Sequence, residues 1–171
     1  LQGDGVVAWQ TQDGVITMIR YDWEGNAPAY PVYAADNYAE FARHHGGDLS
    51  AQRFGWQHCQ FIPGKGLTEA QPGTMSLVDA MRGVTAIGFT ADQVAELKFV
   101  AVFTDGVTQF KDRDWKDVVC ELLAFKLTGG QFVTRRLAAA VREAEKSGAN
   151  PMDDVAAAVI HVLPPETEAA S

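Results

Sequence analysis

The feature that most constrains the fold is an almost unbroken apolar run between residues 97 and 104. Its apolar members are Leu97, Phe99, Val100, Ala101, Val102 and Phe103. The run has the length of a strand, and near-continuous hydrophobicity is typical of a strand buried on both faces. We therefore expect a central strand of a sheet, which ends at Asp105-Gly106.

The start of the chain predicts a β-hairpin. Two β-rich runs, Val6–Gln10 and Val15–Ile19, are separated by a short polar link that contains Asp13-Gly14. Asp-Gly between two such runs is a strong signal for a tight hairpin turn. Two further strands are expected at Phe54–Ile62 and Val84–Phe89.

Two helices and a last strand are expected after residue 113. Asp114 is a suitable N-cap for a helix whose apolar stripe consists of Trp115, Val118, Val119, Leu122 and Leu123. A second helix is expected from Gln131 to Lys146, with Gly148 as its stop. The apolar run Val155–Val162 predicts the last strand.

This order of elements predicts one α+β domain. The chain has 171 residues, of which 47% are hydrophobic, and this length suits one domain with a real core. We expect sheets covered by helices on their outer faces in a domain spanning residues 1–163, followed by a flexible tail at 164–171.

The charge and the cysteines exclude several function classes. The formal net charge is -8 and there is no basic run, so binding to DNA or RNA is not expected. The acidic surface either concentrates divalent cations or only keeps the protein soluble, and we favour solubility. Apolar runs are too short for a membrane helix. Cys59 and Cys120 have neither zinc-site nor disulfide-scaffold spacing, so we expect a reduced, cytoplasmic setting.

The residues that best suggest chemistry are aspartates at the ends of two predicted strands. Asp105 follows the apolar run, and the pair Asp153-Asp154 precedes the last strand. If the two strands are antiparallel neighbours, these carboxylates converge and supply the oxygen ligands that Mg²⁺ and Mn²⁺ prefer. The alternative is that both motifs only form turns, for which Asp-Gly is a common dipeptide.

The stretch from Leu97 to the last strand resembles the C-terminal half of the metal-dependent protein phosphatase family, the type 2C serine/threonine phosphatases. The resemblance lies in the order of Asp105-Gly106, the helical segment and Asp153-Asp154. At the start of the chain, Gly3-Asp4-Gly5 and the hairpin after it are similar to the family's Gly-Asp-Ser strand. Residues 22–83 match only loosely.

The resemblance implies two mainly antiparallel sheets packed together with helices outside. It also implies hydrolysis of phosphoserine and phosphothreonine on protein substrates, with Asp105 and Asp153 as ligands of Mg²⁺ or Mn²⁺ and a metal-bound water as nucleophile. Asp154 is then only a neighbour of the ligand. The alternative is a catalytically silent binding or regulatory module with the same fold. The sequence does not indicate an oligomeric state.

One departure from the family concerns its other metal ligands and its phosphate-binding arginine, which precede the Gly-Asp-Ser strand. The corresponding segment is not in this sequence, which begins at Leu1 rather than at a methionine. We expect an upstream portion, a partner that supplies the ligands, or a degenerate site. The segment His44–Asp48 superficially resembles the family's Asp-Gly-His-Gly-Gly loop, and we interpret it as a plain surface loop.

Overall fold

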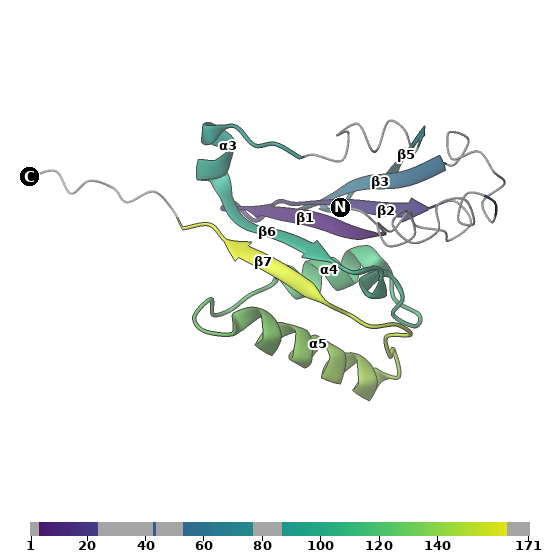
Figure 1. Cartoon of the computed structure of the whole chain (residues 1–171). Coiled ribbons are helices and arrows are strands. Elements are labelled where there is room, and N and C mark those ends of the chain that lie inside the picture. The colour runs from purple at the N-terminus through teal and green to yellow at the C-terminus, as the bar shows by residue number, and fades with distance from the viewer. Residues whose placement is uncertain (1–3, 24–42, 44–52, 77–86, 164–171) are drawn as a thin grey trace, which may run out of the picture.

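The computed structural model of the chain describes residues 4–23, 43, 53–76 and 87–163 (Figure 1). These residues form an α+β domain with a single antiparallel sheet and three α-helices. The strands are β1 (Gly5–Thr11), β2 (Ile16–Trp23), β3 (Arg53–Ile62), β4 (Gly66–Leu67), β5 (Gln71–Ser76), β6 (Leu97–Phe103) and β7 (Ala157–His161). The helices are α3 (Ala91–Glu96), α4 (Trp115–Leu123) and α5 (Phe132–Ser147), and a 3-10 turn, η3, covers Asp105–Thr108.

The sheet has the strand order β4-β3-β2-β1-β6-β7, and β5 pairs with β3 beside this path. All neighbouring strands are antiparallel. The apolar strand β6 lies between β1 and β7, with Ala101 opposite Ala8 on one side and Val159 on the other. Its predicted place inside the sheet is therefore confirmed.

The predicted hairpin is also confirmed. β1 and β2 pair from Gly5 opposite Tyr21 to Gln10 opposite Ile16. In the turn, Gly14 has φ 91°, a conformation that residues with a side chain rarely adopt. The Asp-Gly dipeptide thus predicts the turn because glycine enters this region without strain. The strand expected at Phe54–Ile62 is present as β3.

The start of α4 and the end of α5 lie where their capping residues predict. The Asp114 side chain accepts a hydrogen bond from the backbone N–H of Lys116 at the start of α4. At the end of α5, Gly148 has φ 75° and its N–H donates to the carbonyls of Ala144 and Glu145. The left-handed glycine therefore satisfies carbonyls that the helix leaves open.

Three segments differ from the predictions. α3 was not predicted, although Thr90 and Gln93 form a capping box in which each side chain bonds the other's backbone N–H. Of the strand expected at Val84–Phe89, residues 84–86 lie outside the described residues and residues 87–89 form no strand. The last strand is shorter than predicted.

The core lies between one face of the sheet and helices α4 and α5, which both lie below the sheet in Figure 1. The buried side chains alternate along β6, where Leu97, Phe99, Ala101 and Phe103 point into the core. From α4, Val118, Val119, Leu122 and Leu123 pack against this face, and Ala140 and Ala144 do so from α5. Burial of this face is the main source of stability, because each fully buried Val, Leu or Phe contributes about 1.5–3 kcal/mol.

The opposite face of the sheet corrects the prediction that β6 is buried on both faces. Val102 on β6 is 40% exposed and Ile160 on β7 is 66% exposed. Both project from the face that α4 and α5 leave uncovered. Two packed sheets were expected, but the strands of the described residues are all hydrogen-bonded into one sheet.

Cys59 and Cys120 are free thiols in or beside the core. Burial raises the pKa of both, and that of Cys120 to about 11. Both thiols are therefore protonated at neutral pH, which suits a packing role better than a nucleophilic one.

Several predictions fall on other parts of the chain. The segment His44–Asp48 and the tail 164–171 lie outside the described residues. In the part of the chain that the structure does describe, no helix combines the length and apolar character required to cross a bilayer.

Candidate metal centre

The candidate site lies where β6 ends and the chain returns towards β7. Phe103, the last residue of β6, is opposite Ala157, the first residue of β7. The Thr104 hydroxyl donates to the carbonyl oxygen of Asp154 at 3.0 Å and accepts from the N–H of Ala156 at 2.9 Å. The segment around residue 154 is therefore fixed beside the end of β6.

A second set of backbone contacts joins the turn after η3 to the segment before Asp153. The N–H of Met152 donates to the carbonyl oxygen of Gln109 at 3.0 Å, and the N–H of Lys111 donates to that of Asn150 at 3.1 Å. Phe110 and Pro151 form a β-bridge between these bonds. The two loops thus act as one short ladder that brings distant parts of the sequence together.

Gly106 allows the two loops to approach closely. A Cβ atom at this position would lie only 2.2 Å from the carbonyl oxygen of Asp154. The second residue of Asp105-Gly106 is therefore set by contact with the Asp153-Asp154 segment, and not only by the preference of glycine for turns.

The carboxylates of Asp105 and Asp153 converge on one side-chain amide. Gln109 Nε2 donates to Asp105 Oδ2 at 3.3 Å and to Asp153 Oδ2 at 3.2 Å. The other oxygens are held alike, since Asp105 Oδ1 accepts from the N–H of Gly106 and Asp153 Oδ1 from that of Asp154. The sequence prediction that strand pairing brings the two aspartates together is confirmed.

This corner of the molecule has a negative field. The pKa of Asp105 is raised, first by partial burial and then by the nearby charges of Asp4 and Asp153. The N–H of Gly106 opposes this shift only in part. A bound cation would offset the repulsion that Asp105 experiences here, and so would favour the ionised form of this carboxylate.

The donor set matches a hard divalent cation. Two carboxylates and a carboxamide oxygen are the ligand types that Mg²⁺ and Mn²⁺ prefer, and Mg²⁺ usually retains several waters. Gln109 now presents its amide nitrogen to the carboxylates, so its amide would rotate to act as a ligand. No group of three or more His, Cys, Asp or Glu side chains that could hold a metal ion occurs in the described residues. These residues alone would therefore bind a largely hydrated ion weakly.

A small cavity of about 210 Å³ adjoins Asp105, whereas Asp153 is not part of its lining. Its lining includes Asp4 and Asp105, together with residues that the sequence did not single out: Arg20, Tyr21, Asp22, Thr108 and Gln109. Gln109 follows Asp105 by only four residues, and this short separation is the one sequence feature that could have indicated their contact. Arg20 and Asp22 gave no signal, because only the pairing of β2 with β1 brings them to this corner.

The side chains of two further residues, Asp154 and His161, take no part in this arrangement. The Asp154 side chain is exposed, and the contacts of this residue here are made by its backbone. His161 on β7 packs its ring against Phe99, with 5.1 Å between ring centroids, so this histidine belongs to the packing of the sheet.

Comparisons of the chain with protein-family models, with curated proteins and with solved structures gave no match.

Proposed function

We propose that this chain is a Mg²⁺- or Mn²⁺-dependent phosphatase that hydrolyses phosphoserine and phosphothreonine monoesters on proteins, similar to the type 2C phosphatases. The supporting observation is the convergence of Asp105 and Asp153 on the single amide of Gln109. The substrate class and the cytoplasmic setting rest on the sequence resemblance and on cysteine usage.

In the proposed reaction the residues of this chain hold the metal ion and orient its ligands. Asp105 and Asp153 each use one oxygen to bind the neighbouring backbone N–H, which fixes the direction of the other. A divalent cation supplies the chemistry, because it lowers the pKa of water and offsets charge on the phosphoryl oxygens. In the absence of a cation, Gln109 keeps the two carboxylates together through two long hydrogen bonds. A bound cation would replace these bonds.

The proposal extends to the complete fold. A second antiparallel sheet would pack on the open face that carries Val102 and Ile160 and would complete a two-sheet sandwich with α4 and α5 outside. Apolar side chains as exposed as these two are an expected surface for such packing. The remaining metal ligands would come from residues beyond those described.

The direct test is Mn²⁺-dependent phosphate release from an aryl phosphate by the protein that the full reading frame encodes. Asp105→Asn and Asp153→Asn should each lower the rate by at least about tenfold, because each removes a charged ligand. Asp154→Asn is the matched control, since it changes the adjacent exposed carboxylate and should retain most activity. Full turnover in Asp105→Asn would disprove the assignment.

A second candidate function is a binding or regulatory module that has this fold without catalysis. It is favoured by Gln109, whose amide already satisfies both carboxylates without a cation. Calorimetry with Mn²⁺ separates the two functions. The phosphatase should bind the ion at or below millimolar concentrations, whereas the silent module should not.

A further inference from the structure

Arg20 is the positive side chain of the cavity beside the carboxylates. Of the described residues that line this cavity, Arg20 alone carries a positive charge, and three carry negative charges: Asp4, Asp22 and Asp105. The cavity therefore has one cationic group, paired with Asp22, close to Asp105, which is one of the two proposed metal ligands. Such a cavity suits an anion that is bound to a metal cation, because Arg20 can contact the anion while the carboxylates attract the cation.

Strand pairing fixes the position of Arg20. Arg20 on β2 lies opposite Val6 on β1, and Val6 lies opposite Phe103 on β6. The three residues form a row across the sheet, and Asp105 follows Phe103 by two residues. The guanidinium is held in turn by Asp22, whose carboxylate lies 2.8 Å from Arg20 Nη2.

The Arg20–Asp22 pair has little value for stability. The side chains are 26% and 53% exposed, and exposed ion pairs contribute about 0–1 kcal/mol. The pair does hold a planar group with five N–H donors at the wall of the cavity, and such a group can bind two oxygens of a phosphoryl group at once.

The size of the cavity limits what can enter it. At about 210 Å³ it is smaller than the roughly 300–1,000 Å³ of pockets that enclose drug-sized ligands. It can accept a phosphoryl end group while the rest of the substrate stays outside.

We infer that Arg20 binds the phosphoryl oxygens of a phosphomonoester at this site, with Asp22 as the residue that positions its guanidinium. The inference rests on the proposed function and adds a substrate-binding residue to it. Inorganic phosphate, the product of hydrolysis, should bind at the same place. Because three carboxylates line the cavity, phosphate should bind more tightly when Mn²⁺ is present.

The test measures inorganic phosphate binding by calorimetry, with and without Mn²⁺, together with Mn²⁺ binding itself. Arg20→Gln should weaken phosphate binding by about tenfold or more and should leave Mn²⁺ affinity undiminished. Arg20→Lys keeps the charge but loses the planar fork, so its loss should be smaller. Lys126→Gln is the control, because it removes one positive charge from the exposed loop between α4 and α5.

Kinetics supply the second readout, since Arg20→Gln should raise KM for an aryl phosphate more than it lowers kcat. If its phosphate affinity equals that of Lys126→Gln while Mn²⁺-dependent turnover persists, the inference fails and the proposed function stands. If phosphate binds through Arg20 and no hydrolysis occurs, the inference stands and the phosphatase is excluded. Absence of phosphate binding in the unaltered protein, with and without Mn²⁺, overturns the inference.

Discussion

Asp105 carries its charge at a corner where burial and two neighbouring aspartates oppose ionisation. Its pKa is raised above 3.8, so the folded protein binds this proton more readily than the unfolded chain does. Stability therefore falls as pH rises from about 3.8 through the raised pKa. At neutral pH the whole cost of ionising Asp105 is present, and metal binding would relieve it.

Asp105→Asn should accordingly stabilise the metal-free protein at pH 7, by less than about 1 kcal/mol because the group is partly exposed. The gain should disappear below about pH 3.8, where the aspartate is protonated in both states. Urea denaturation with a chelator at several pH values measures it. Asp13→Asn is the contrasting control, because the pKa of Asp13 is lowered by the hydrogen bond from Thr11. A pH-independent gain in Asp105→Asn would contradict the electrostatic explanation.

Gln109 has the amide that stands between the two carboxylates in the metal-free protein. Gln109→Glu removes both hydrogen bonds and adds a third carboxylate, so it should destabilise the metal-free protein and raise Mn²⁺ affinity by about tenfold. Calorimetry and urea denaturation measure the two effects. Gln71→Glu makes the same charge change at an exposed position of β5. Equal Mn²⁺ affinities in the two variants would mean that Gln109 does not face the ion.

At the scale of the elements, the contact of η3 with the segment before β7 requires a glycine, which has no side chain, at position 106. Gly106→Ala places a methyl group 2.2 Å from the carbonyl oxygen of Asp154, so the two backbones must separate. We expect a loss of about 1–3 kcal/mol and weaker Mn²⁺ binding. Thermal unfolding and calorimetry measure these, and Gly88→Ala is the control because nothing lies within 4 Å of its added Cβ. Equal stability of the two variants would contradict the contact.

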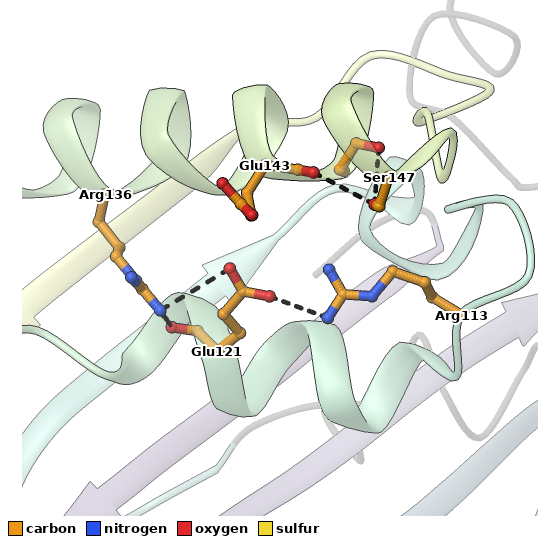
Figure 2. Close-up of polar contacts among 6 residues, drawn as sticks. Arg113, Glu121, Arg136, Glu143 and Ser147 are labelled. Carbon is orange, nitrogen blue, oxygen red and sulfur yellow. Dashed lines mark hydrogen bonds and ion pairs between the residues drawn. The ribbon is translucent and has the colours of Figure 1, made fainter.

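Helices α4 and α5 are joined by a polar network around Glu121 (Figure 2). The Glu121 carboxylate pairs with Arg113 at 2.8 Å and with Arg136 at 3.9 Å. The Arg136 guanidinium also donates to the backbone carbonyl oxygen of Glu121. The network thus ties the loop before α4, the end of α4 and the first turns of α5 to each other.

Arg136→Met should destabilise the domain more than Glu121→Gln. The glutamine variant loses only partly exposed ion pairs, worth about 0.5–1 kcal/mol, whereas the methionine variant also leaves the Glu121 carbonyl without these bonds, for a total of about 1–2 kcal/mol. Denaturant midpoints measure the difference. Lys146→Met, which removes an exposed pair with Glu143, should change stability little. A larger loss in Glu121→Gln than in Arg136→Met would contradict this ranking.

Across the whole molecule, the two faces of the sheet have different environments. One face is covered by α4 and α5, whereas the other leaves Val102 and Ile160 exposed in the described part of the chain. The hydrophobicity of residues 97–104 predicts a strand that is buried on both faces. In the described residues, only the face towards α4 and α5 is buried.

Prediction from sequence was most successful where the signal is local. The β1–β2 turn, the Asp114 cap and the Gly148 stop each follow from the backbone preferences of one or two residues. The place of β6 inside the sheet followed from its apolar content. α3 is the exception, because its capping box encloses only six residues and no buried side chain.

In the candidate site, too, local signals predicted some residues, whereas others depend on the tertiary structure. Strand-end positions of Asp105 and Asp153 predicted their convergence, since antiparallel neighbours bring one strand's end beside the other's start. Arg20, Asp22 and the bridging role of Gln109 depend on register and loop packing, which no spacing in the sequence encodes. Local preferences thus determined the elements and the aspartates at their ends, while long-range strand pairing decided which other side chains meet them.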